Sequence, residues 1–491
     1  MPGNIKSFFF EMPRVIRSSN RLVELSAPTW HDVGRNLANE VSEKSCFAYR
    51  YDRAMYEDEP DIHKLWKEDL AVKAKSSMAS RTPLAYDLCC GFDSVFTSRG
   101  EGFSVWELLT LYEVDMFLHE FHYKCRYCEK RIMQGVRYLC TDCNPASTTS
   151  GSSTEDDSAK KKRARALKRG TLRNPKHISV CMDCFPAHNV CEDCGDPRTL
   201  TPTSVLHETS GVGIANKSGC TGFGYRDDSA YFCGQTLEMA TDTYNYGRFD
   251  TIYKLNNTSS KVTVLVYDVG CILSPFGINS NRLGLCVFNL YNSDYSLPPY
   301  NSSEARVPMA SLQWEILLRG SRTVKDAFDF LVAERIPTFT SASFIIAADG
   351  DTSVIEVTAN AHWTPPGADD LTEDNQPSAI MVGKANNSRW ICRANNCLAG
   401  SCLHKSESLP PNISSKQRQA DLSVSFNDRL SLPIDVAWAK SALSSPTIQT
   451  EYCLGTIVME PMASRMHVRF RVGTRIGTTL KDGGKWEIFT I

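Results

Sequence analysis

The sequence lacks any hydrophobic run that could cross a bilayer. No stretch approaches the roughly eighteen uncharged apolar residues that a spanning helix needs. The apolar run at residues 8–10 is too short for the core of a signal peptide, and Glu11 ends it. We therefore expect a soluble, non-secreted protein of the cytosol or the nucleus, with no membrane partner.

The chain also lacks an excess of charge of one sign. It has 54 Lys and Arg against 56 Asp and Glu, which gives a net charge of -2. This balance gives no overall reason to expect nucleic acid as the main partner. With 491 residues, 42% of them hydrophobic, the chain is long enough for roughly two to four domains and a substantial core.

Cysteine, in contrast, is abundant and clustered. Of the 19 cysteines, eight fall within about seventy positions, all in CxxC pairs. Such pairs point two thiolates at one tetrahedral zinc ion and are typical of proteins in reducing compartments. Unligated thiols packed as small hydrophobic residues are the alternative, but they do not explain the repeated spacing. With a nearby histidine, the pairs supply enough ligands for two structural zinc ions. The predicted ligands are Cys125, Cys128, Cys140, Cys143, Cys181, Cys184, His188, Cys191 and Cys194.

The order of these pairs resembles the ZZ-type zinc finger, a cross-braced module. A first CxxC is followed by GVRYLCTDC, which has the glycine, arginine and aromatic residue that precede the family's second pair, and then by VCMDC. The resemblance implies that the first and third pairs share one zinc ion and that the second pair shares the other with a terminal pair. The family ends in HxxH, whereas this chain has His188, Cys191 and a spare Cys194, so the last ligand stays open. ZZ fingers usually bind proteins, which implies a protein partner.

A polar segment at about 145–175 separates the two halves of the predicted finger. It begins with Ser, Thr and Gly, continues with acidic residues and ends with basic ones, which predicts a disordered insertion. We interpret the basic run as a solvated loop. A nuclear signal and a nucleic-acid contact are the alternatives.

After the finger, β-branched and alternating segments have the length and period of strands. The expected strands are 229–237, 261–270, 282–291, 343–349, 352–359 and 453–460. Apolar residues three and four positions apart predict helices at 311–320 and 323–335, the second capped by Thr323. Gly350 is expected in the turn of a hairpin, and Glu356 near its end in a structural role. Cysteines in or beside the apolar strands are expected to be core thiols; these are Cys271, Cys286, Cys392, Cys397 and Cys453.

Cys220 belongs to no CxxC pair, since its neighbours are Gly219 and Thr221 and the next cysteine is Cys233. It opens an ordered series of segments: SGCTGF, YFCGQTLE, FGINSNRLGLCVFN, LLRGSRTVKDAFDFLVAERIP, SFIIAADGDTSVIEV and RANNCL. This series, from residue 217 to about 400, resembles the N-terminal-nucleophile (Ntn) hydrolases related to isopenicillin N acyltransferase, the acyl-coenzyme A:6-aminopenicillanic acid acyltransferase. It is more distantly similar to penicillin V acylase and bile salt hydrolase.

The resemblance extends upstream to the segments 28–41 and 102–117. It implies an α+β fold, an αββα sandwich interrupted by the finger. Residues 28–120 would form the N-terminal part of the Ntn-hydrolase domain and residues 200–491 its main part. Residues 121–199 would form the inserted cross-braced, two-zinc ZZ-like finger.

The resemblance also implies a nucleophile made by self-cleavage between Gly219 and Cys220. A thiol with a reference pKa of about 8.5 needs a base or a positive environment to attack at neutral pH. The α-amine that cleavage would release has a pKa of roughly 7.7 to 8.0 and can act as that base. Gly219 suits the cut because a residue without a Cβ permits a strained turn.

Further roles follow from the resemblance residue by residue. Glu238 takes the place of an aspartate that binds the α-amine. The Asn395 side chain is expected to donate to the oxyanion, and Asn279 to line the same cleft. An arginine beside the nucleophile is expected late in the chain, where Arg469 and Arg471 are both candidates.

Two functions remain open from the sequence. The first is a self-processing cysteine amidohydrolase or acyltransferase that acts on amide or acyl-thioester bonds of a small molecule through an acyl-Cys220 intermediate. The second is an inactive Ntn scaffold whose zinc finger recruits a protein partner, which the departures from the family motifs would favour. We favour the enzyme, because the GCT motif, a carboxylate and an amide are all in register.

Overall fold

The computed structural model of the chain describes two large sheets, the helices that cover them and a small third sheet. For the strands at 136–140, 179–181, 200–204 and 379–384 it describes only the backbone. The described residues are 22–40, 70–100, 104–110, 136–140, 179–181, 200–204, 219–238, 251–268, 272, 275–290, 306–333, 336, 338–339, 341–357, 379–384, 389–396, 413–429, 431–449, 453–470 and 484–491.

The first large sheet has eight strands in the order β1-β7-β8-β9-β10-β11-β12-β13. Neighbouring strands are antiparallel, except that β1 runs parallel to β7. The strands are β1 (Leu22–Ala27), β7 (Thr251–Asn257), β8 (Val262–Asp268), β9 (Phe276–Asn279), β10 (Leu283–Asn289), β11 (Ala342–Ala348), β12 (Asp351–Val357) and β13 (Ala379–Lys384).

The second large sheet has six antiparallel strands in the order β14-β5-β6-β15-β16-β17. Its pairs β5–β6 and β15–β16 are hairpins with short connections, and β5 carries the segment that follows Cys220. The strands are β14 (Trp390–Arg393), β5 (Thr221–Arg226), β6 (Tyr231–Glu238), β15 (Cys453–Glu460), β16 (Arg465–Phe470) and β17 (Trp486–Thr490).

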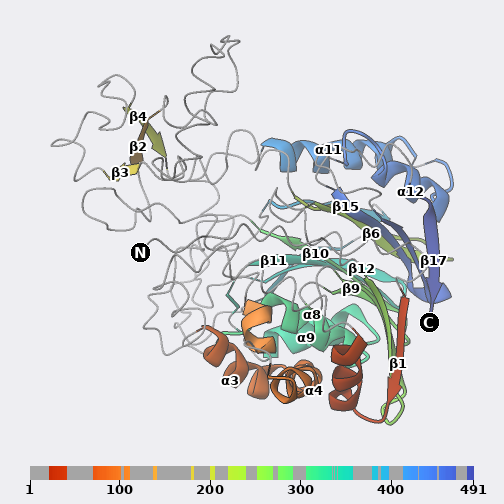
Figure 1. The fold of residues 1–491 in the computed structure, drawn as a ribbon. Helices are drawn as coiled ribbons and strands as arrows, with labels where there is room; N and C mark the ends of the chain where they lie inside the picture. The colour runs from red at the N-terminus through yellow and green to blue at the C-terminus, as the bar shows by residue number, and fades with distance from the viewer. Residues whose placement is uncertain are drawn as a thin grey trace, which may run out of the picture.

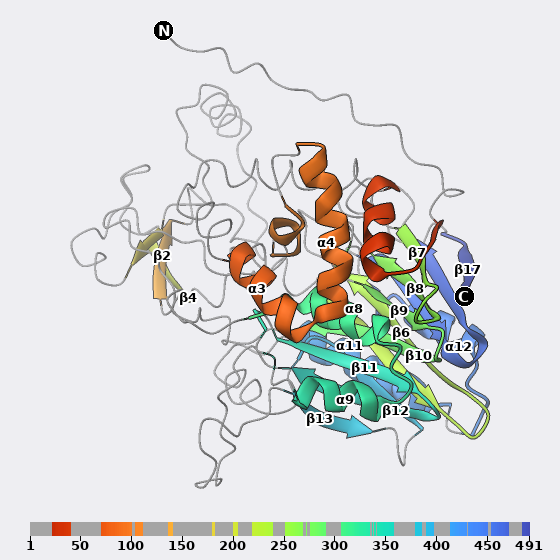
Figure 2. The same ribbon diagram turned by 90° about the horizontal axis from the view of Figure 1, so that it is seen from below.

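The two sheets stack on each other, and helices cover both outer faces (Figure 1). Figure 2 shows the helices that lie over the eight-stranded sheet. This arrangement explains why β6 and β11 are buried along their whole length, since each has one face on the other sheet and one face under helices. The fold is therefore mixed α+β, with the helix, sheet, sheet, helix order that we expected. The helices over the eight-stranded sheet are α3 (Ala71–Arg81), α4 (Pro83–Ser98), α8 (Met309–Leu318) and α9 (Val324–Ala333); those over the six-stranded sheet are α11 (Ile413–Asn427) and α12 (Val436–Leu443).

The elements predicted from apolar patterning are present. The six predicted strands correspond to β6, β8, β10, β11, β12 and β15, and the two predicted helices to α8 and α9. The predicted cap is confirmed, because Thr323 and Asp326 exchange backbone-to-side-chain hydrogen bonds of 3.0 Å each. Gly350, with a φ of +71°, occupies the turn between β11 and β12 as predicted.

Segments on both sides of the predicted finger share one core. The fully buried Glu315 carboxylate on α8 accepts hydrogen bonds from the Leu84 and Ala85 backbone N–H groups, both at 2.9 Å. These donors lie in the first turn of α4, where helix N–H groups have no partner within the helix. The shared hydrophobic cluster includes Trp30, Phe92, Phe96, Tyr253 and Trp314. The domain boundaries that we expect stay a prediction.

The small sheet has the order β3-β2-β4, with β2 (Val136–Cys140), β3 (Ser179–Cys181) and β4 (Leu200–Ser204) all antiparallel. Its strands come from both sides of the 145–175 segment, so the backbone at Cys140 and at Cys181 belongs to one sheet. The other seven predicted zinc ligands lie outside the described residues. Within the part of the chain that the structure describes, no cluster of three or more His, Cys, Asp or Glu side chains could hold a metal ion. No helix in that part has the length and apolar character needed to cross a membrane.

Candidate active site

Cys220 lies where β5 begins, and 5% of the residue is exposed. In the antiparallel register Thr221 faces Thr236, so Cys220 lies beside the last residues of β6. The backbone N–H of Glu238 donates a hydrogen bond to the Cys220 sulfur, and Glu238 itself is buried. The pairing of two sequence-adjacent strands therefore brings the predicted nucleophile and the predicted carboxylate together.

The surroundings of Cys220 favour its neutral thiol. Burial, together with the negative charge of Glu238, raises the pKa of the Cys220 thiol to about 12. The hydrogen bond from the Glu238 backbone and the positive charge of Arg418 act in the opposite direction, and burial wins. In the full-length chain the thiol is thus protonated at neutral pH, and it would need a base to attack a carbonyl carbon.

Gly219, directly before Cys220, is held between two polar side chains. Its φ of +142° lies in the region that favours glycine. A Cβ at this position would lie 2.3 Å from Asn395 Oδ1 and 2.7 Å from Arg418 Nη2. Asn395 and Arg418 therefore contact the backbone at the bond where we expect the cut.

Gly219→Ala is expected to slow self-cleavage by about 10-fold or more, since a strained backbone conformation costs about 1 to 3 kcal/mol and the new methyl group would displace Asn395 or Arg418. The measurement is the rate at which newly synthesised full-length chain is cut. The matched control is Gly350→Ala, because Gly350 also has a positive φ but a Cβ there would have open space around it. Equal rates for the two variants would contradict the prediction.

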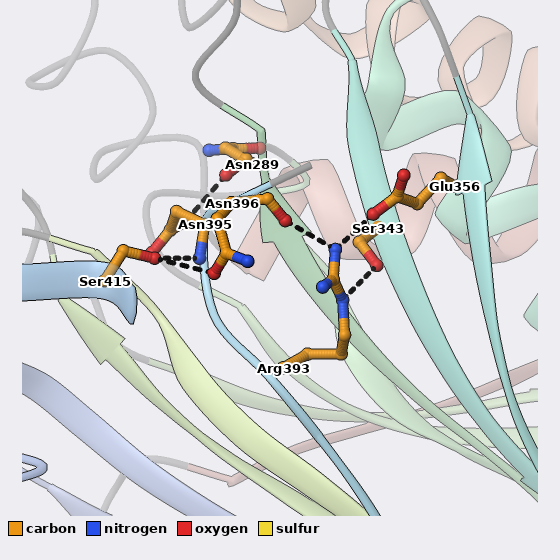
Figure 3. A network of polar contacts seen from close by, with 7 residues as sticks. All are labelled: Asn289, Ser343, Glu356, Arg393, Asn395, Asn396 and Ser415. Atoms are coloured by element: carbon orange, nitrogen blue, oxygen red, sulfur yellow. Dashed lines mark hydrogen bonds and ion pairs between the residues drawn. The ribbon is translucent and has the colours of Figure 1, made fainter. Parts of the chain in front are cut away.

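Asn395 lies in the turn after β14, and hydrogen bonds fix the orientation of its side-chain amide (Figure 3). Its backbone N–H donates to Ser415 Oγ at 2.8 Å, and its side-chain Nδ2 donates to the Asn289 carbonyl at 2.7 Å. Because a carbonyl can only accept, the amide orientation is fixed, and Oδ1 faces Gly219. Oδ1 is buried and has no hydrogen-bond partner among the described residues. Contrary to our expectation, the amide in the full-length chain presents an acceptor to Gly219 and not an oxyanion donor.

Arg418 is a site residue that the sequence analysis missed. It projects from α11, is 2% exposed and donates from Nε to Thr221 Oγ1 at 2.8 Å. Of the two late arginines proposed for this place, Arg469 instead donates to the Gly484 carbonyl at 3.0 Å and to Ser444 Oγ at 3.1 Å. Arg471 lies outside the described residues. Among the residues that the structure describes, Arg418 is therefore the arginine that acts on Cys220.

Asn279 does not lie with this group. Its Nδ2 donates to the Ser321 carbonyl at 3.0 Å, and its Oδ1 accepts from the backbone of Asn281 and Leu283 at 3.0 and 3.1 Å. It thus closes the turn before β10, whereas Asn289 at the far end of that strand contacts Asn395. Leu283, which binds Asn279, lies six residues from Asn289 along β10, and this separation corresponds to roughly 20 Å.

Three other buried thiols, Cys233, Cys286 and Cys453, belong to the strands around Cys220. Cys453 pairs with Glu238 across the sheet, and Cys286 hydrogen bonds with Cys233. Burial raises the pKa of Cys286 and of Cys453 well above that of an ordinary thiol. Of the expected core thiols, Cys286, Cys392 and Cys453 are buried, while Cys271 and Cys397 lie outside the described residues.

Taken together, the site contains a buried thiol, a carboxylate, a cation and an amide oxygen around one peptide bond. A thiol next to a carboxylate can transfer its proton and attack a carbonyl carbon. A guanidinium can stabilise the oxyanion that forms. The arrangement can therefore support acyl transfer to sulfur.

No protein-family model and no curated protein matches the chain. Among solved structures, it is similar to a Caenorhabditis elegans ortholog of N-acylethanolamine-hydrolyzing acid amidase, with 12% identity over 49% of this chain and 93% of that chain (TM-score 0.35). A penicillin V acylase from Agrobacterium tumefaciens has 14% identity over 52% and 84% (TM-score 0.33). A mutant conjugated bile acid hydrolase from Clostridium perfringens has 15% identity over 55% and 97% (TM-score 0.31). Similarity at this level does not assign the chain to a family.

Proposed function

We propose that the chain is a self-processing cysteine amidohydrolase or acyltransferase of the Ntn type, with Cys220 as its nucleophile. The observation that carries this proposal is the position of Gly219. It precedes a buried thiol, it has a φ of +142°, and it contacts both Asn395 and Arg418. A glycine held in this way next to a thiol, a carboxylate and a cation is what a self-cleaving peptide bond needs.

In the processing step, the Cys220 sulfur attacks the Gly219 carbonyl carbon through a five-membered ring. The thiol proton passes to a base, for which the candidate is the Glu238 carboxylate, whose charge acts on Cys220. Arg418 stabilises the oxyanion of the tetrahedral intermediate. The C–N bond breaks, the Cys220 nitrogen takes up a proton, and a thioester remains. Water hydrolyses the thioester and leaves a Gly219 carboxylate and a free α-amine on Cys220.

The mature site would use the same groups on an external substrate. The new α-amine accepts the thiol proton, because its pKa of roughly 7.7 to 8.0 allows it to act as a base at neutral pH. Glu238 and the acceptor Oδ1 of Asn395 hold this amine by hydrogen bonds. The thiolate attacks the carbonyl carbon of an amide or an acyl thioester, and the amine or thiol of the substrate leaves with the proton that the α-amine had accepted. The acyl group on Cys220 then passes to water or to an amine. Hydrolase and transferase differ only in that last acceptor.

The cysteine pairs from Cys125 to Cys194 add a second part to the proposal. They form a ZZ-like finger with two structural zinc ions that recruits a protein partner or a substrate and supplies no catalytic step. Its support is the CxxC spacing, together with the pairing of β2 with β3 and β4 across the 145–175 segment. We place the protein in the cytosol or the nucleus, because free thiols and zinc pairs suit a reducing compartment.

The experiment that tests the enzyme is N-terminal sequencing and intact-mass analysis of the purified full-length chain. We expect two fragments, residues 1–219 and 220–491, with Cys220 as a new N-terminus. The purified chain should then release the acyl group from a panel of simple amides and acyl thioesters. A chain that stays whole would contradict self-processing and favour the alternative, an inactive scaffold whose finger is the working part.

A further inference from the structure

Arg393 is a fully buried arginine that joins the two large sheets. It is the last residue of β14 in the six-stranded sheet, and its side chain crosses to the eight-stranded sheet (Figure 3). There its Nε donates to Ser343 Oγ at 3.1 Å, and its Nη2 forms an ion pair with the Glu356 carboxylate. Ser343 and Glu356 face each other directly across β11 and β12. The guanidinium therefore spans both strands and fixes one sheet relative to the other.

The same guanidinium also holds the turn that carries Asn395. Arg393 Nη2 donates to the Asn396 carbonyl at 2.7 Å, and Asn396 Oδ1 accepts from Ser415 Oγ at 3.2 Å. Ser415 binds the Asn395 backbone as well, and it lies one helical turn before Arg418 on α11. The two side chains that contact Gly219 are thus connected through one network that ends at the Arg393–Glu356 pair.

Stability alone does not explain a buried pair of this kind. Desolvation of two charges offsets most of their attraction, so an apolar replacement is often neutral or stabilising. Within the described residues Arg393 Nη1 is buried without a hydrogen-bond partner, which adds to the free-energy cost of burying the pair. What the pair does provide is geometry, because a planar guanidinium directs several donors at fixed angles.

We propose that Arg393, anchored by Glu356, is a positioning residue that holds Asn395 in place for the reaction at Gly219. The inference rests on the proposed function. Arg393 touches neither Cys220 nor Gly219; it acts through the Asn396 carbonyl and the turn. Small displacements of a reacting group can cost about 100-fold in rate, so loss of this anchor should be visible in the rate of cutting even where the fold survives.

The test compares two variants in cell-free synthesis, with self-cleavage followed in time. Arg393→Lys keeps a positive charge for Glu356 but cannot direct donors at Glu356, Ser343 and the Asn396 carbonyl in one plane. The double variant Arg393→Met, Glu356→Met removes both charges and leaves no buried charge unpaired. We expect both to keep a melting temperature near that of the wild type and to cut about 10- to 100-fold more slowly. Hydrogen exchange at the Asn395 backbone N–H should become faster in both.

The matched control is Arg319→Lys, which alters another arginine that pairs with a buried glutamate, Glu315, on α8. This control should cut at the wild-type rate. Wild-type cutting by either Arg393 variant would overturn the inference, as would slow cutting with unchanged exchange at Asn395. A wild-type chain that stays whole would instead overturn the proposed function, and because it is run beside the variants the two failures are distinguishable.

Discussion

Cys220→Ala is expected to leave the chain as one polypeptide of 491 residues, whereas we expect the wild type to be cut into two. The methyl group of alanine cannot attack the Gly219 carbonyl, and the other groups of the site only assist that attack. The loss of self-cleavage should therefore be complete and not partial. Intact mass and gel analysis of the two purified chains, prepared in parallel, measure it directly.

Two neighbouring thiols provide the controls for this result. Cys286 and Cys453 are as buried as Cys220, and their charges would interact with it. Neither precedes or follows a glycine held between a cation and an amide, so Cys286→Ala and Cys453→Ala should still be cut at Gly219. Cutting that continues in Cys220→Ala, or stops in either control, would assign the chemistry to a different residue.

The parts of the site that lie on adjacent strands could be predicted from the sequence. Gly219, Cys220 and Glu238 come from one hairpin, so the β5–β6 register alone brings them together. The strands themselves could be recognised because a strand that is buried on both faces needs apolar residues along its whole length, as in ASFIIAA of β11. Local pattern and local pairing carry this information, and no distant contact is needed.

The remaining parts of the site depend on contacts between distant residues. Arg418 and Thr221 are 197 positions apart, and α11 has a polar, serine-rich sequence with no apolar period that would reveal it as a covering helix. Asn279 ends β9 and Asn289 ends β10, and only the three-dimensional contacts show that Asn279 closes a turn while Asn289 lies beside Asn395. The orientation of the Asn395 amide depends in turn on the Asn289 carbonyl. None of these contacts is indicated by a periodic pattern or a fixed spacing in the sequence.

Arg418→Met is expected to slow self-cleavage by about 100- to 1,000-fold, the usual effect of removing a group that stabilises an oxyanion. The guanidinium contacts Gly219, and its charge also opposes the increase in the pKa of the Cys220 thiol. Without it the thiol should be still harder to deprotonate, so the variant should cut faster as the pH is raised from 7 to 9. The time course of cutting at several pH values measures both the slower rate and its dependence on pH.

The matched control is Arg469→Met, because Arg469 is one of the two late arginines that the sequence offered as candidates and its side chain binds Ser444 and the Gly484 carbonyl instead. That variant should be cut at the wild-type rate. Arg418→Lys should be cut at a rate between those of the wild type and Arg418→Met. An ammonium keeps the charge but cannot hold Thr221 and face Gly219 with the fixed geometry of a guanidinium. If Arg469→Met is the slow variant and Arg418→Met is not, the cation that serves the oxyanion is Arg469 and the geometry of the uncut chain must change before the bond is broken.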